Sequence, residues 1–108
     1  MTLEQKVAQL VQIPYTRVGR EEAEEWARRG VGSFLHVMGD DARHLQKIAM
    51  ENGAKIPLLF GIDAIHGHCL NNRATIFPTQ LSMACSFSPE LVKRMGRATA
   101  REVSADGL

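Results

Sequence analysis

The side chains most able to do chemistry gather between residues 61 and 73. Residues 61–67 read Gly-Ile-Asp-Ala-Ile-His-Gly and follow an apolar run. In parallel α/β proteins the loop after a strand lies at the carboxyl end of the sheet, where barrels and open sheets bind ligands. By position Asp63 fits either a ligand-binding carboxylate or a turn residue satisfied by backbone N–H groups. His66 lacks the partners that catalysis requires, which favours a structural histidine bonded to the loop backbone.

A metal site is a second interpretation of the same segment. His66, His68 and Cys69 could ligate a metal, with His36 or Asp63 as a further ligand. No Cys-x-x-Cys or His-Glu-x-x-His cluster accompanies them, and two histidines two residues apart in a loop define no coordination geometry. The sequence also has no Gly-x-Gly-x-x-Gly, no Walker-type lysine and no obvious nucleophilic serine. We therefore predict no metal and no cofactor, and rank a metal-binding module last.

Two strands are predicted to position this segment. Residues 31–37 are short and rich in β-formers, and residues 56–62 are almost continuously apolar, as in a strand covered on both faces of a parallel sheet. Pro57 is tolerated at the first position of such a strand. The long stretch over residues 66–87 has few periodic apolar positions, and a connection of that length is usually functional when it is ordered.

Four helices are predicted from apolar periodicity combined with cap and stop residues. They run from the Thr2 capping box to Pro14, from Arg20 to Arg29, from an Asp40 or Asp41 cap to Asn52, and from the Ser88 cap to Asp106. The buried side expected of the last helix consists of Leu91, Val92, Met95, Ala98, Thr99 and Val103. The resulting order is an α/β alternation whose two strands lie parallel. Two strands cannot cover their own edges, so the sequence is typical of the opening of a larger structure.

Composition excludes several classes of protein. The 108 residues are 44% hydrophobic and 23% charged, which is typical of one globular domain. Thirteen basic and twelve acidic residues leave no excess charge for nucleic acid. No apolar run approaches the ~20 residues of a membrane span, and Met1 leads into a charged amphipathic stretch, so we expect no membrane partner and no signal peptide. Cys69 and Cys85 are expected to be free thiols.

Five segments, taken in order, resemble the amino-terminal region of glycoside hydrolase family 3, and most of all its β-glucosidase branch. The pairing of Gly-Ile-Asp-x-Ile-His-Gly at 61–67 with Ala-Thr-Ile-Phe-Pro at 74–78 is far more specific than either motif alone. The N-acetylhexosaminidase branch instead has Asp-Gln-Glu-Gly-Gly at the corresponding strand end. The five matching segments are residues 2–9, 30–35, 56–67, 74–78 and 87–107.

The resemblance implies a complete protein with a (β/α)8 TIM-type barrel, usually followed by a second domain, that cleaves terminal β-glycosides with retention. Such chemistry needs two carboxyl groups about 5–5.5 Å apart. In the family the nucleophilic Asp lies on a later strand and the acid/base Glu usually in the second domain, so residues 1–108 are expected to lack both. They would form the first two β/α units of the barrel, without an internal boundary, and be inactive alone. The expected partners are a β-glucoside or related oligosaccharide, the rest of the barrel and the second domain.

Three site residues follow from the resemblance. Asp63 matches the Asp that hydrogen-bonds sugar hydroxyls in the innermost subsite, a task that suits a carboxylate because it accepts from two neighbouring hydroxyls. His66 also matches, with loop support as its expected role. Arg73 is a further candidate for sugar contact, although residues 68–73 depart from the family's usual aromatic-Arg pair or Gly before Ala-Thr.

Two points stay open at the level of sequence. The alternative to a fragment of an enzyme is a short non-catalytic protein that binds sugar or pairs with another half-barrel chain. The compartment is also unassigned, because family members are often periplasmic or secreted whereas no signal peptide is visible in this sequence.

Overall fold

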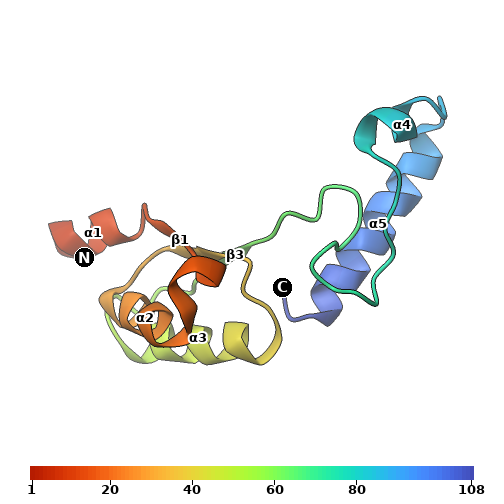
Figure 1. Ribbon diagram of the computed structural model, residues 1–108. Helices are drawn as coiled ribbons and strands as arrows, with labels where there is room; N and C mark the ends of the chain where they lie inside the picture. Colours follow the sequence, from red (N-terminus) through yellow and green to blue (C-terminus); the bar gives the residue numbers. More distant parts are fainter. The chain divides into compact units, whose positions relative to one another are not determined.

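A computed structural model describes residues 1–108 (Figure 1). The chain divides into two compact units, residues 1–62 with Gly107 and residues 63–106 with Leu108. No helix in it combines the length and the apolar character needed to cross a membrane. In chain order the elements are α1 (Leu3–Ala8), β1 (Gln12–Pro14), α2 (Tyr15–Arg29), β2 (Ser33–Leu35), α3 (Gly39–Glu51), β3 (Leu59–Gly61), α4 (Gln80–Ala84) and α5 (Pro89–Ala105).

The first unit is built on a parallel sheet of three strands in the order β1-β2-β3. Phe34 at the centre of β2 pairs in register with Ile13 and Phe60 on either side. Its side chain is fully buried in the core. Helices α2 and α3 make the two crossovers between successive strands, as parallel pairing requires. The α/β alternation predicted from the sequence is therefore confirmed.

Strand β1 corrects the sequence prediction, which extends the first helix to Pro14 and counts two strands. The Thr2 capping box forms, but α1 ends at Ala8. Beyond it the backbone pairs with β2, and the Ser33 N–H donates to the Val11 carbonyl at 3.2 Å. Buried backbone N–H and C=O groups need hydrogen-bond partners, and β2 supplies them here. This segment therefore forms a strand although its apolar residues have a helical spacing. The other two strands are shorter than predicted, with three residues each.

Helix α2 begins earlier than predicted but ends as predicted. It starts at Tyr15 and is interrupted at Gly19, whose φ of 75° is not helical. It stops at Gly30, where the left-handed φ of 84° suits a residue without Cβ. Two ion pairs between residues four apart form at 2.9 Å on this helix, Arg28 with Glu24 and Arg29 with Glu25.

Helix α3 packs against α2 through small and aliphatic side chains. Its predicted cap is wrong: Met38 precedes the helix without a side-chain cap, and Asp40 and Asp41 lie in the first turn, where acidic groups favour the helix dipole. The buried residues of the two helices, all part of the hydrophobic core, are Ala23 and Ala27 of α2 and Ala42, Leu45, Ile48 and Ala49 of α3.

Polar contacts also join α2 and α3. His44 Nε2 lies 2.9 Å from Glu24 Oε1, and this contact, together with Arg28, lowers the pKa of Glu24. The Tyr15 hydroxyl donates to Asp41 Oδ2 at 2.6 Å. Burial and the neighbouring Asp41 raise the pKa of Tyr15 to about 12, because both disfavour the phenolate.

The second unit consists of the segment after β3 followed by α4 and α5 (Figure 1). The Ser88 cap is confirmed, since its hydroxyl accepts from the Leu91 N–H at 3.3 Å. Helix α4 lies within a stretch predicted to be irregular. The predicted buried side of α5 is wrong within residues 1–108: none of its residues is buried, and Leu91 and Val92 are exposed.

We expect the isolated 108-residue chain to self-associate and to unfold without a sharp transition. Leu3, Leu59 and Phe87 are 77%, 73% and 92% exposed, and β1 and β3 are edge strands. Apolar side chains and unpaired edges of this kind recruit other chains. Sedimentation and thermal denaturation would measure both properties.

A matched pair of variants localises the effect. Leu59→Lys places a charge on the β3 edge and should shift the chain toward monomer, whereas Thr16→Lys adds the same charge at an exposed position of α2 and should not. A wild-type chain that is a clean monomer with a two-state transition would contradict this prediction.

Candidate functional site

The segment that follows β3 is closed on itself by paired contacts. His66 Nδ1 donates to the Phe77 carbonyl at 2.9 Å, and the Phe77 N–H donates to the His66 carbonyl at 2.8 Å. Next to this pair, Gly67 forms an antiparallel bridge with Ile76. The two ends of the loop over residues 66–77, hereafter the closed loop, are therefore joined side by side. This is the contact that loop support by His66 requires.

Gly67 is required where the closed loop comes together. Its φ is 116°, and a Cβ there would lie 2.1 Å from the Thr75 carbonyl oxygen. Both the backbone conformation and the close approach exclude a side chain. The second glycine of the Gly-Ile-Asp-x-Ile-His-Gly motif is thus explained by packing of the backbone.

Helix α5 holds the closed loop at two points, one helical turn apart. Asp106 Oδ2 accepts from His68 Nε2 at 2.8 Å and from Asn71 Nδ2 at 2.7 Å. One turn earlier, Glu102 accepts from the Thr75 N–H at 3.1 Å and from its hydroxyl at 2.9 Å. The hydrogen bonds from Asn71 and His68 lower the pKa of Asp106, because they favour the ionised carboxyl. Sequence reasoning missed both anchors, since each partner lies more than 25 residues away.

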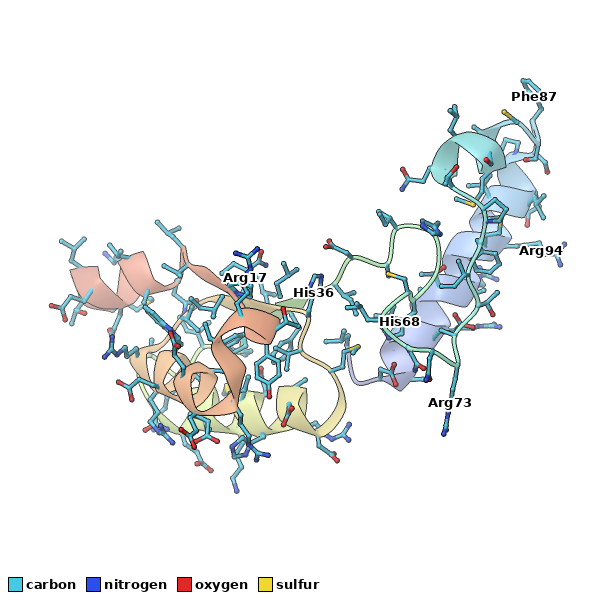
Figure 2. All side chains as sticks on the ribbon, viewed as in Figure 1. Arg17, His36, His68, Arg73, Phe87 and Arg94 are labelled. Carbon is cyan, nitrogen blue, oxygen red and sulfur yellow. The ribbon has the colours of Figure 1, made fainter.

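Asp63 lies two residues after β3, where it is expected from the sequence. It is exposed, and its carbonyl accepts from the Cys69 thiol at 3.2 Å. Arg73 is also exposed, and its backbone N–H donates to Asn71 Oδ1 at 2.9 Å. Figure 2 shows the Arg73 side chain extending away from the loop. The structure thus places Asp63, His66 and Arg73 in one unit, and their roles toward a sugar stay predictions.

The metal-site interpretation is not supported by the geometry. His68 is committed to Asp106, and the Cys69 thiol points to a backbone carbonyl. Nowhere in residues 1–108 do three or more His, Cys, Asp or Glu side chains come close enough to hold a metal ion. Cys69 and Cys85 are exposed free thiols.

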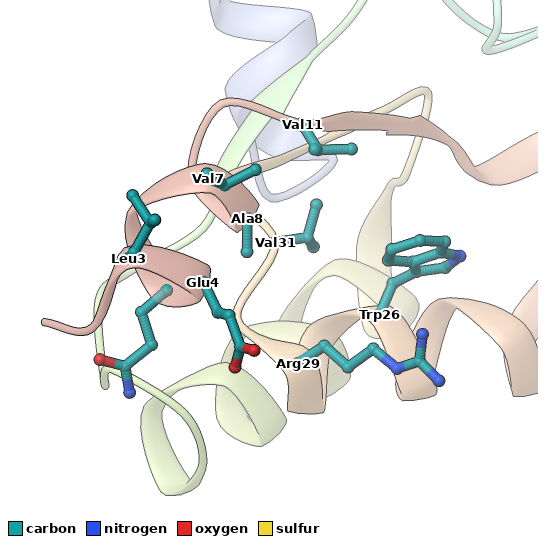
Figure 3. A pocket seen from close by; sticks show the side chains of 9 residues that line it. Leu3, Glu4, Val7, Ala8, Val11, Trp26, Arg29 and Val31 are labelled. Carbon is teal, nitrogen blue, oxygen red and sulfur yellow. The ribbon is translucent and has the colours of Figure 1, made fainter.

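A groove in the first unit has the wrong chemistry for a sugar (Figure 3). It lies between α1 and the end of α2, where the Arg29 guanidinium sits 5.5 Å from the centre of the Trp26 ring. Sugar sites need several converging hydrogen-bonding groups, and most of this lining is apolar. The lining residues are Leu3, Glu4, Gln5, Val7, Ala8, Val11, Trp26, Arg29 and Val31.

Comparison with known proteins identifies the family. Residues 2–108 match the family described as "Glycosyl hydrolase family 3 N terminal domain". The chain therefore belongs to glycoside hydrolase family 3, of which it carries N-terminal sequence. The resemblance drawn from the motifs is confirmed.

Three proteins show what this chain is similar to. It is 36% identical over 112 residues to the periplasmic beta-glucosidase of Salmonella typhimurium, a match that covers 100% of this chain and 14% of that protein. It is 31% identical over 65 residues to the lysosomal beta glucosidase of Dictyostelium discoideum, covering 59% of this chain and 8% of that protein. A crystal structure of a variant of the exo-1,3/1,4-beta-glucanase from a Pseudoalteromonas species superposes with a TM-score of 0.85 at 34% identity, covering 100% of this chain and 20% of that chain.

Gly67→Ala should disrupt the closed loop. A Cβ 2.1 Å from a backbone oxygen, at a φ that L-residues avoid, should lower the free energy of unfolding by at least about 1–3 kcal/mol. Gly96→Ala is the matched control, because Gly96 lies within α5 with nothing near its missing Cβ. Thermal melts of the full-length protein would compare them. Equal melting temperatures for both variants would show that the loop tolerates the side chain.

Proposed function

We propose that this chain is part of a retaining β-glycosidase that hydrolyses terminal β-glucosides. The observation that carries the proposal is the family match over residues 2–108. Two relatives have β-glucosidase in their names, and the solved relative is an exo-glucanase. The chain spans 14% and 8% of the length of these two curated relatives, so the activity belongs to the longer protein that contains it.

Within that protein, residues 1–108 would form the beginning of a (β/α)8 barrel. Three parallel strands lie in chain order with a helix between each pair, which is how a barrel winds. Strand β1 adds one unit to the two expected from the sequence. A whole barrel takes about 250 residues, so most of its strands come from elsewhere in the protein.

Asp63 is the residue of this chain proposed to bind the sugar. It follows the carboxyl end of β3, where barrel enzymes carry their sites, and it is exposed. Its carboxylate can accept from two neighbouring sugar hydroxyls in charge-assisted hydrogen bonds. This fixes the orientation of the ring relative to the reacting groups and does not itself break the bond.

The nucleophile and the acid/base are proposed to lie outside residues 1–108. Around the closed loop, Glu102 is bonded to Thr75 and Asp106 to His68 and Asn71. A general acid must keep its proton near neutral pH, and the lowered pKa of Asp106 works against that. Both carboxylates therefore serve the structure of the loop.

The full-length protein should hydrolyse an aryl β-glucoside with retention, and the 108-residue chain should turn over at background. The reason is that a retaining mechanism needs two carboxyl groups about 5–5.5 Å apart, which the longer chain supplies. Activity is measured by release of the aryl group, and retention by NMR of the first product. Activity that copurifies with the 108-residue chain and is lost in Asp63→Asn would contradict the hypothesis that residues 1–108 lack both catalytic carboxyl groups. Sugar binding without hydrolysis by the full-length gene product would favour the non-catalytic alternative.

Asp63→Ala in the full-length protein should lower kcat/KM by roughly 10²-fold, about 3 kcal/mol, as expected for removing one preorganised polar group from a water-poor site. Its melting temperature should stay close to wild type, because the residue is exposed. Asp40→Ala is the matched control, since the Asp40 side chain is 96% exposed on α3. Normal kcat/KM with a much lower melting temperature would show that Asp63 is a turn residue only.

A further inference from the structure

His68 stands out among the polar side chains of the second unit. It is fully buried, and its Nε2 lies 2.8 Å from Asp106 Oδ2. Because an ionised carboxylate only accepts hydrogen bonds, Nε2 must carry the hydrogen. The other ring nitrogen, Nδ1, is buried without a partner. A buried histidine with one committed and one unpaired nitrogen costs free energy, which calls for a compensating role.

The hydrogen bond to Asp106 fixes the position of the His68 ring relative to the end of α5. Asp106 is the C-cap of α5, and Asn71 donates to the same oxygen at 2.7 Å. The Asn71 N–H also donates to the His68 carbonyl at 3.0 Å, so the turn after His68 is fixed from both ends. The bond from Thr75 to Glu102 prevents the far side of the loop from rotating about this point. The position of residue 69 is thereby set by α5.

Cys69 connects this fixed part of the loop to Asp63 by hydrogen bonds. Its N–H donates to the Gly67 carbonyl at 2.9 Å, and its thiol donates to the Asp63 carbonyl at 3.2 Å. A chain of contacts therefore runs from Asp106 through His68 and Cys69 to the backbone of Asp63. All four residues belong to the second unit, so the chain of contacts lies within one compact body.

The geometry points to His68 as a positioning residue for Asp63, acting through Cys69 and anchored on Asp106. This inference rests on the proposed function, since it assumes that the Asp63 carboxylate binds sugar. A carboxylate that must meet two hydroxyls tolerates little displacement, and misplacement by about 1 Å can cost 10²-fold in rate. The backbone of Asp63 follows a strand on one side, and on the other its carbonyl accepts from the Cys69 thiol, so losing that hydrogen bond removes one restraint on where the carboxylate lies.

The test compares variants of the full-length protein with an aryl β-glucoside. His68→Leu keeps the bulk but removes the donor, and should lower kcat/KM by roughly tenfold or more. His68→Gln restores an N–H near the Nε2 position and should recover most of the loss. In an Asp63→Ala background, His68→Leu should lower kcat/KM by less than about threefold, because a residue that acts through Asp63 has nothing left to position.

Cys69 supplies an independent arm if His68→Leu does not fold, because Cys69 is exposed. Cys69→Ala should lower kcat/KM, Cys69→Ser should recover most of it through its hydroxyl, and Cys85→Ala, at the other exposed cysteine, should leave it unchanged. A Cys69→Ala protein as active as Cys85→Ala, or independent multiplicative losses for His68→Leu and Asp63→Ala, would overturn the inference.

The same data separate this inference from the proposed function. Full activity in Asp63→Ala removes the proposed sugar contact, and the positioning role falls with it. Loss of activity in Asp63→Ala with full activity in both the His68 and the Cys69 variants leaves the sugar contact standing and overturns the positioning role alone.

Discussion

Two carboxylates one turn apart, Glu102 in the last turns of α5 and Asp106 at its C-cap, hold the segment on which the candidate site depends. A loop without regular structure must find partners for its N–H groups and polar side chains, or it stays mobile. Here the loop folds back through His66 and Phe77, and further donors of the loop bond to α5. A helix is a suitable base for this purpose because side chains four residues apart share one face. The order of the site therefore comes from a regular element.

The apolar surface left on α5 and on the sheet edges fits a chain that spans a minor share of its relatives. A parallel sheet is stable when helices and further strands cover it, and here β1 and β3 are its edges. Leu91 and Val92 are exposed on a helix that buries none of its residues. In our proposal the rest of the barrel would cover these side chains. The helical period of α5 is visible in the sequence, but the surface that would bury it is not supplied by residues 1–108.

The features that the sequence predicts correctly are those decided within a few residues. The caps at Thr2 and Ser88 and the stop at Gly30 depend on local backbone geometry and on groups three residues away. The errors concern elements decided at long range. Strand β1 has only three residues and is recognised by its pairing with β2, and the five-residue α4 is too short to show a period.

The residues of the candidate site show the same difference between local and long-range features. Asp63 stands out in the sequence because its position after a strand and its motif are both local features. The sequence suggests for His68 only a possible metal ligand, because its partner Asp106 lies 38 residues further along. No spacing rule connects a loop histidine to a helix cap at that distance. A long loop with several polar donors, followed by a helix with carboxylates at i and i+4, is the signal available, and it is weak without a structure.

The Gly-Ile-Asp-x-Ile-His-Gly motif can now be given physical content position by position. At Gly61 a Cβ would lie 3.2 Å from the side chains of both Gln12 and Leu35, so the first glycine leaves room for these two side chains. His66 and Gly67 close the loop, one by a hydrogen bond and one by having no side chain. These positions build a support, and Asp63 lies between them with its side chain exposed. If Asp63 binds sugar as we propose, this support has a purpose beyond stability, because a carboxylate that must meet two hydroxyls needs a fixed backbone.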